Sequence, residues 1–347
     1  MKISIGTQTK EGPWGGGNLF AINLKEYLVR KGHKVVSDLS SDDIDLILLT
    51  EPRRTSESSA FTHYDIMNYK KYIKKDTLVV HRLNECDERK NTKFVNEYLK
   101  FANTSVANYS VFVSAWLQDI YYNVGLKSEN RKVIYAGANS EIFNNQNNSH
   151  WDGKSKFKIV THHWGANWNK GFDIYSRLDS LLAEKEFKEK FEFTYIGNLP
   201  KKFSFKNSNY VKPLSGRELA NELKKNHAYL TASINEPSGN HHIEGAQCGL
   251  PLLFLNSGGT VEYCKDFGLM FEKDNFENQL NKFCDNYSIY FEKIQNYPHT
   301  AEKMCEEFEL LFLHMFENKS KFLNNEDFIS KQKYFEKKYF LNKRTFN

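Results

Sequence analysis

Short apolar runs alternate with amphipathic stretches along the first half of the chain. A short apolar run rich in β-branched side chains predicts a buried strand, and apolar residues that recur every three or four positions predict a helix. Residues 2–6 predict a strand, residues 7–17 a glycine-rich loop, and residues 18–31 an amphipathic helix that ends at Gly32. The same reasoning predicts strands over residues 33–36, 44–49, 78–81, 110–113 and 132–135, with helices over 60–74, 90–103 and 114–122.

The same alternation restarts after a polar stretch. Residues 144–154 are crowded with Asn, Ser and Gly, and we interpret them as a linker. Strands are then predicted over residues 157–161, 191–196, 228–232, 251–255 and 268–271, with helices over 172–183 and 217–225 and a helical pattern from 275 onward. Ser215 and Glu218 have the spacing of a capping box at the start of the helix over 217–225.

Alternating strands and helices predict parallel strands that are joined by helical crossovers. The sequence therefore predicts an α/β chain of two doubly wound, Rossmann-like domains that face each other across a cleft, with a helical C-terminus. We expect an N-terminal domain over residues 1–145, a C-terminal domain over 146–320, and a helical tail over 321–347 that packs back on the N-terminal domain. Ligands of such sheets bind beyond the carboxyl ends of the strands, so candidate chemistry is sought in the loops that follow strands.

Composition supports this organisation and excludes several classes of protein. The chain has 347 residues, which exceeds the roughly 250–300 residues at which a single core stops growing. Its 48 basic and 43 acidic residues leave a net charge of only +5, spread along the chain, which does not favour a nucleic-acid partner. No apolar run approaches the roughly 20 residues of a membrane span, no signal peptide is recognisable, and the five cysteines are scattered. We expect a cytoplasmic protein.

The segment from Glu236 to Glu244 has the most informative polar pattern. Glu236 follows a predicted strand, and Glu244 lies about two turns into a helix that should begin near Asn240. Ser238 and Gly239 lie in the turn before this helix, where free backbone N–H groups favour an anion such as phosphate. A carboxylate on each side of the anion can accept hydrogen bonds from sugar hydroxyls. The spacing alone leaves open that Glu236 only ends a loop and that Glu244 is a solvated helix position.

Four segments, in the same order along roughly residues 130–270, resemble motifs of retaining GT-B glycosyltransferases, especially glycosyltransferase family four. Glu236 and Glu244 match the E-x7-E motif of that family. The other matching segments are VIYAGAN over residues 133–139 with Phe143, HHWGANWNKGFD over 162–173, and GLPLLFLNSGGTVE over 249–262. Two positions depart from the pattern: Asn139 replaces an Asp, and Gly165 stands where the family often has an Arg, whose part then falls to His163, Asn167 or a basic residue elsewhere.

The resemblance implies a role for each matching residue. Lys170 would neutralise the diphosphate of a nucleotide-sugar donor, Glu236 would hold hydroxyls of the transferred sugar, and Glu244 would bind the ribose diol. A fixed cation and helix-end amides would stabilise the leaving diphosphate without a metal or other cofactor. The remaining donor-side positions are Gly16, Gly17, His163, Asn167, Pro213 and Leu214 after a strand near residues 210–212, Ser238, Gly239, Asn240 and His241.

His81 is a further catalytic candidate, because it ends the strand predicted over residues 78–81 and members of the family often carry a cleft-facing His at this strand end. Arg82 and Asn84, which follow it, are weaker candidates. The alternative interpretation is a surface loop that is held by local hydrogen bonds.

Other patterns are interpreted as having no catalytic role. Asp43 and Asp45 form a D-x-D sequence, but they begin a strand, so their carboxylates should face away from the cleft. The His pairs at 162–163 and 241–242 have no evident third ligand, so no metal site is predicted. The Lys-rich tail from Lys331 to Arg344 predicts a solvated helix face, with a membrane surface or an anionic partner as the alternative.

The function that these observations favour is transfer of a hexosyl or pentosyl group from a UDP-, GDP- or ADP-linked donor to a glycan or other hydroxyl acceptor. The expected enzyme retains the anomeric configuration by a same-face mechanism. Two alternatives remain: a nucleotide-sugar epimerase or hydrolase on the same fold, and a nucleotide-sugar-binding protein without catalysis.

Overall fold

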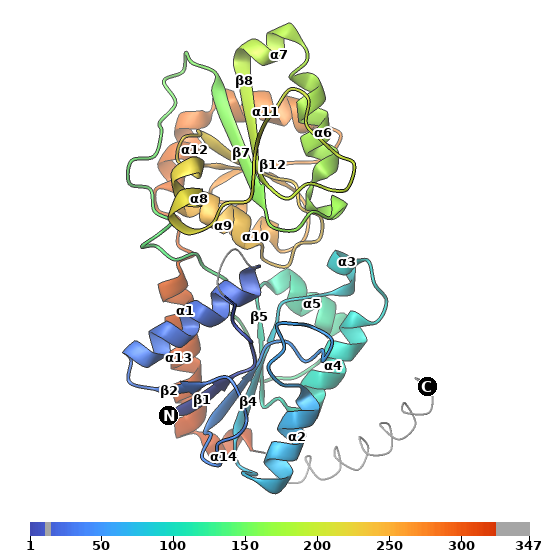
Figure 1. Ribbon diagram of the computed structural model, residues 1–347, viewed down its shortest axis with the longest axis vertical. Coiled ribbons are helices and arrows are strands. Elements are labelled where there is room, and N and C mark those ends of the chain that lie inside the picture. The colour runs from blue at the N-terminus through green and yellow to red at the C-terminus, as the bar shows by residue number, and fades with distance from the viewer. Residues whose placement is uncertain (11–14, 324–347) are drawn as a thin grey trace.

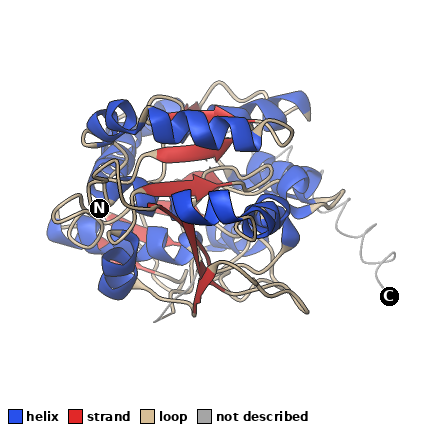
Figure 2. Cartoon of the chain, turned by 90° about the horizontal axis from the view of Figure 1, so that it is seen from above, coloured by secondary structure: helices blue, strands red, loops and turns tan. Residues whose placement is uncertain are grey.

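Two parallel sheets make up the framework of the protein. The computed structural model describes residues 1–10 and 15–323, and in this part of the chain each half builds one six-stranded sheet. The N-terminal half lies below the C-terminal half in Figure 1, and the strands lie between helices in the view from above in Figure 2. The predicted fold of two doubly wound domains is therefore confirmed. Part of the glycine-rich loop, the tail beyond residue 323 and its Lys-rich segment fall outside the described residues.

The N-terminal sheet has the strand order β2-β1-β3-β4-β5-β6, and every neighbouring pair is parallel. Its strands are β1 (Lys2–Ile5), β2 (Lys34–Val36), β3 (Leu46–Leu49), β4 (Leu78–Leu83), β5 (Tyr109–Phe112) and β6 (Arg131–Val133). The helices of this half are α1 (Gly16–Arg30), α2 (His63–Tyr72), α3 (Asp87–Lys90), α4 (Val95–Val106) and α5 (Ala115–Asn123).

The central strands of this sheet are apolar on both faces, because helices cover both. Leu46 and Leu48 of β3 pack into the core beneath α1, whereas Ile47 and Leu49 pack into the core that includes residues of α2. Successive side chains of a strand point to opposite faces, so a continuous apolar run is what a doubly covered parallel sheet requires. This explains why the strands could be predicted from runs rather than from alternation.

The C-terminal sheet has the strand order β12-β11-β10-β7-β8-β9 and is also parallel throughout. Its strands are β7 (Phe157–His163), β8 (Phe191–Gly197), β9 (Asn209–Val211), β10 (Ala228–Thr231), β11 (Leu252–Leu255) and β12 (Gly268–Phe271). The helical elements of this half are the 3₁₀ turn η1 (Trp168–Lys170), α6 (Phe172–Leu181), α7 (Lys185–Lys190), α8 (Gly216–Leu223), α9 (Asn240–Gln247), α10 (Thr260–Cys264), α11 (Phe276–Asp285) and α12 (Tyr287–Ile294).

The start of α8 differs from expectation. Ser215 occupies the N-cap position, but its side chain makes no capping hydrogen bond, so the predicted capping box with Glu218 does not form. Gly216 adopts a φ of 55°, a left-handed conformation at the first helical position that differs from a regular helix start.

The chain crosses between the two halves twice, and the two crossings lie side by side. The Ala138 N–H donates to His299 O at 3.2 Å, and the Ala301 N–H donates to Ala138 O at 2.7 Å. At Gly137 an added Cβ would lie 2.1 Å from Thr300 O, so only glycine permits this approach. The crossing precedes the segment that the sequence analysis interpreted as a linker, residues 144–154. Trp151 of that segment packs edge-on against Phe157 in the C-terminal core.

After the second crossing the chain returns to the N-terminal half in the helix α13 (Ala301–Glu317), which the short helix α14 (Lys319–Phe322) follows. Figure 1 shows α13 beside α1. Met304, Phe308 and Phe312 of α13 are buried in the same core as Phe20 and Leu24 of α1. The return to the N-terminal half therefore begins at Ala301, before the boundary expected at residue 320. The apolar face of α13 identified a helix but not the sheet that it covers.

Candidate active site

A cleft of about 910 Å³ lies between the two halves of the chain. Its walls come from the N-terminus of α1, from the loops that follow β3 and β4, and from the loops that follow β7, β9 and β10. These loops all leave the carboxyl ends of parallel strands, the place where doubly wound sheets bind ligands. Most of the residues singled out from the sequence lie here: Gly16, Gly17, His163, Asn167, Lys170, Pro213, Leu214, Glu236, Ser238, Gly239, Asn240, His241 and Glu244.

Glu236 is the centre of an ion-pair network that spans the cleft. Its Oε2 lies 2.5 Å from the Nζ of Lys170, in the C-terminal half. Its Oε1 accepts a hydrogen bond of 2.9 Å from the Nε of Arg89, at the end of α3 in the N-terminal half. Arg89 also binds Glu85 at 2.8 Å. The side chain of Glu236 is only 8% exposed, so both of its oxygens are paired with cations at a nearly dry position.

The two cations control the ionisation of Glu236. Burial by itself raises the pKa of a carboxyl group, but the charges of Arg89 and Lys170 outweigh that effect and hold the pKa of Glu236 well below its usual range. In return, Glu236 raises the pKa of Arg89. Burial lowers the pKa of Lys170, and Glu236 offsets part of that change. Glu236 is therefore an ionised carboxylate and does not act as a general acid.

Glu244 lies on α9, eight residues after Glu236, and has a simpler environment. One carboxylate oxygen, Oε2, lies 2.8 Å from the Nε2 of His162. The hydroxyl of Tyr229 lies 3.1 Å from the other ring nitrogen of His162, and so fixes the ring. Within the described residues, the second carboxylate oxygen of Glu244 makes no hydrogen bond, although it belongs to a residue that lines the cleft. Glu244 therefore presents a free acceptor to the cleft.

The start of α9 depends on a glycine. Gly239 is its N-cap and adopts a φ of 80°, and an added Cβ would lie 2.8 Å from the ring of His241. The Nε2 of His241 lies 2.9 Å from the hydroxyl of Thr231, so the ring is fixed and the backbone around Gly239 must approach it closely. The predicted helix start at Asn240 is confirmed, with its first turn directed at the cleft.

Gly16 of the N-terminal half meets this helix across the cleft. A Cβ added to Gly16 would lie 2.7 Å from the Oδ1 of Asn240. The N-terminus of α1 and the N-terminus of α9 are thus in near contact, and each contributes backbone N–H groups to the same space.

His81 does not lie in the cleft, in contrast to the expectation. Strand β4 continues to Leu83, two residues beyond the predicted end. Because side chains alternate along a strand, His81 points to the side of α4, where its Nδ1 lies 3.2 Å from the amide of Asn103. The ring is fully buried, and burial lowers the pKa of His81 to about 3. Arg82 and Asn84 line the cleft instead.

The main residue that the sequence analysis missed is Arg89. It lies 147 residues before Glu236, within a charged stretch that is interpreted most simply as a solvated helix. The sequence indicated that a basic residue was needed to replace the Arg absent at Gly165, but nothing in the chain indicated which one. The fold brings α3 to the loop that follows β10, and this contact places Arg89 beside Glu236.

Residues 258–262, the end of the segment GLPLLFLNSGGTVE, link the two halves instead of lining the cleft. The carboxylate of Glu262 accepts hydrogen bonds from the backbone N–H groups of Ala115 and Trp116, at 2.8 Å and 2.7 Å, at the start of α5. A carboxylate at a helix N-terminus is stabilised by the free N–H groups and by the helix dipole. Glu262 therefore acts as an inter-domain helix cap.

The patterns that suggested metals lie in other environments. Asp43 pairs with Lys2 at 2.6 Å and Asp45 pairs with Lys74 at 3.2 Å, both at the amino end of the N-terminal sheet and outside the cleft. In the part of the chain that the structure describes, no group of three or more His, Cys, Asp or Glu side chains is arranged to hold a metal ion. Among the same residues, no helix is both long and apolar enough to cross a membrane.

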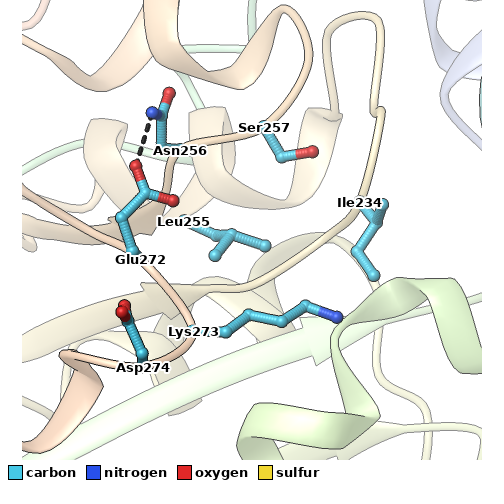
Figure 3. Close-up of a pocket in the computed structure, with 7 residues that line it drawn as sticks. All are labelled: Ile234, Leu255, Asn256, Ser257, Glu272, Lys273 and Asp274. Carbon is cyan, nitrogen blue, oxygen red and sulfur yellow. Dashed lines mark hydrogen bonds between the residues drawn. The ribbon is translucent and has the colours of Figure 1, made fainter.

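A second hollow lies at the carboxyl ends of β11 and β12, on the rim of the C-terminal sheet (Figure 3). Three of its polar side chains are already paired: Asn256 donates to Glu272 at 2.6 Å, and Lys273 binds Asp173 at 3.1 Å. None of the residues predicted to act in the site lies in it. It therefore offers less chemistry than the cleft between the domains.

The sequence matches no known family profile and no curated protein. Solved structures of the same shape do exist. The Anabaena protein HepE, solved with UDP and glucose, is similar over 90% of this chain and 100% of its own, with a TM-score of 0.65 and 13% identity. A glycosyltransferase from Rickettsia africae covers 91% of this chain and 99% of its own, with a TM-score of 0.65 and 14% identity. A sucrose-phosphate synthase from Thermosynechococcus elongatus covers 91% and 99%, with a TM-score of 0.63 and 12% identity.

The protein has the GT-B fold. Both halves and their relative placement contribute to the similarity, because the matches extend over about nine tenths of the chain. At identities of 12–14% the similarity concerns the fold, and the chemistry of the cleft depends on its own residues.

Proposed function

We propose that this protein is a retaining, metal-independent glycosyltransferase that uses a nucleotide-sugar donor. The observation that carries the proposal is the pairing of Lys170 with Glu236 just before the start of α9, with Glu244 in the second turn of that helix. The place of each in the cleft matches the role that the E-x7-E resemblance implies. HepE was solved with UDP-glucose and also with UDP and glucose, which makes UDP-sugars the first donors to test.

Lys170 and Arg89 are proposed to hold the donor diphosphate. Both cations lie on Glu236, at 2.5 Å and 2.9 Å, so they are already directed at one point in the cleft. Arg89 would supply from the N-terminal half the second charge that Gly165 does not provide. When the diphosphate binds, its oxygens replace the Glu236 carboxylate on these cations, and Glu236 becomes free to accept hydrogen bonds from sugar hydroxyls.

The two glutamates would contact different parts of the donor. Glu236 lies before the start of α9, on the side where the sugar and phosphates would be, and its charge would stabilise the positive charge that develops on the sugar ring. Glu244 lies within α9, with one free carboxylate oxygen and a fixed His162 neighbour, and would bind the ribose diol. Ser238, Gly239 and Asn240 would present the helix N-terminus to the phosphates.

The proposed reaction takes place on one face of the sugar. The bond between the anomeric carbon and the phosphate oxygen breaks as the acceptor hydroxyl forms a new bond to the same carbon from the same side. The hydroxyl proton passes to the leaving phosphate oxygen. Lys170, Arg89 and the α9 amides stabilise the charge that the diphosphate gains, so no side chain has to act as nucleophile or general base.

Thermal shift with UDP-, GDP- and ADP-sugars tests donor binding, because a ligand that binds only the folded chain raises its stability. The donor that gives the largest shift is then incubated with a library of glycan acceptors, and the anomeric configuration of the product is read by NMR. A product with the donor's configuration supports the proposal. Donor turnover that is equally fast without any acceptor would favour an epimerase or hydrolase, and binding without turnover would favour a binding protein.

A further inference from the structure

Arg82 is a buried cation at the floor of the cleft. It lies near the end of β4, lines the cleft, and is only 5% exposed. Strand alternation directs it away from the His81 side and towards α1, where its guanidinium carbon lies 3.9 Å from the centre of the Phe20 ring. Burial lowers the pKa of Arg82 to about 10, so the folded chain holds this charge at a cost.

The other cations that line the cleft are all neutralised by carboxylates. Arg89, Lys90 and Lys170 bind Glu85 or Glu236, Lys10 binds Glu57, and Arg53 binds Glu51. Arg82 differs: its guanidinium makes no hydrogen bond and no ion pair with any residue that the structure describes, and it lies over the Phe20 ring. A buried guanidinium with five unused N–H donors is unfavourable unless an anion completes it.

The N-terminus of α1 lies beside Arg82 and carries the same sign of charge. Phe20, the ring under Arg82, is in the second turn of α1, and Gly15, Gly16 and Gly17 at the helix start also line the cleft. No side chain makes a capping hydrogen bond at this start, and the first turn contains no acidic residue. The free N–H groups of this helix start, which also face the start of α9, make the potential around the unpaired guanidinium more positive, so an anion is favoured beside Arg82.

This site is separate from the charges around Glu236. Glu85, Arg89, Glu236 and Lys170 pair with one another, and none of the described ion pairs joins Arg82 to this network. Arg82 lies on β4 of the N-terminal sheet and contacts α1 of the same half, whereas Lys170 and Glu236 belong to the C-terminal half, which Arg89 reaches through its ion pair with Glu236. Two cationic centres in one cleft suit two anionic ligands better than one.

We propose that Arg82, on the α1 side of the cleft, forms a subsite for an acidic group, a phosphate or a carboxylate, on the acceptor. The inference rests on the proposed function, because it assumes that the donor diphosphate occupies the Lys170 side. It narrows the acceptor to anionic molecules, such as a sugar phosphate, a lipid-linked phosphate or an acidic glycan.

Calorimetric titration of inorganic phosphate into the full chain, saturated with the nucleoside diphosphate that binds it best, tests the subsite. The variants are Arg82→Met and Arg82→Lys, with Arg53→Met as the matched control, because Arg53 lines the same cleft but is already paired with Glu51. Phosphate affinity should fall at least about tenfold in Arg82→Met, less in Arg82→Lys, and less than about twofold in Arg53→Met. Glucose 6-phosphate should displace the phosphate, and glucose should not.

The melting temperature provides a second, independent measurement. Arg82→Met should melt at or above the wild-type temperature, because the variant loses a buried charge that has no partner. The inference is overturned if phosphate binds equally well to Arg82→Met, or if that variant loses nucleoside diphosphate affinity as strongly as phosphate affinity. The latter result would assign Arg82 to the donor. If no nucleoside diphosphate binds any form of the chain but phosphate binding still depends on Arg82, the proposed function fails and the subsite stands.

Discussion

Glu236→Gln should separate binding from catalysis. Gln keeps the shape of Glu236 and one acceptor oxygen but removes the negative charge that lies 2.5 Å from Lys170 and 2.9 Å from Arg89. Without that charge, both cations are freer to bind a diphosphate. The donor KM should therefore stay unchanged or fall, which is the reverse of the usual effect of a mutation in a binding site.

The turnover number should fall at the same time. A carboxylate about 5 Å from a sugar ring that gains a full positive charge contributes ~3 kcal/mol at an effective dielectric constant of about 20. Loss of that energy in the transition state lowers kcat by about two orders of magnitude. The matched variant is Glu244→Gln, in which the altered group is proposed to contact the unreactive ribose. It should raise the donor KM more than it lowers kcat, because uniform binding affects KM.

Steady-state kinetics of the two variants, with circular dichroism as the control for folding, tests this pair of expectations. Equal and small effects on kcat and KM at both positions would refute the reasoning, because the motif would then have only a structural role.

The pH dependence of stability gives an independent check. The lowered pKa of Glu236 stabilises the folded chain above the unfolded pKa of about 4.3, and this stabilisation is lost as the pH falls below it. The melting temperature of the wild type should exceed that of Glu236→Gln at pH 7, and the gap should narrow below about pH 4.

Three further outcomes are expected. Lys170→Ala should lower kcat by about a hundredfold or more and also weaken donor binding, since the diphosphate is charged throughout the reaction; kinetics together with calorimetry of the nucleoside diphosphate checks both effects. Activity should survive EDTA, whereas a strict requirement for Mn²⁺ or Mg²⁺ would show that a metal site exists despite the position of Asp43 and Asp45 outside the cleft. Gly16→Ala should raise the donor KM with little change in melting temperature, because its Cβ would lie 2.7 Å from Asn240 Oδ1 and displace that side chain at the start of α9; an unchanged KM would show that donor binding does not depend on the position of the Asn240 side chain.

Much of this protein could be predicted from the sequence because burial leaves a local pattern. Each predicted strand has a counterpart in the two sheets, since strands covered on both faces must be apolar at successive positions. The position of α9, with Glu244 in it and Glu236 before it, also follows from local chemistry, because a glycine before a helix and a carboxylate after a strand depend only on their immediate neighbours.

Tertiary structure decided what depends on partners far along the chain. The apolar face of α13 does not specify which sheet it covers, and the fold returns it to the N-terminal half. Strand β4 continues to Leu83 because Arg82 and Leu83 pair with β5, so His81 points into the interior and Arg82 faces the cleft. Local sequence does not determine where the strand ends, because that end depends on the neighbouring strand. Arg89 became part of the site through a contact with Glu236 that spans 147 residues. Local sequence determines which residues are buried and in which element, whereas the pairing of charges depends on distances that only the packed fold sets.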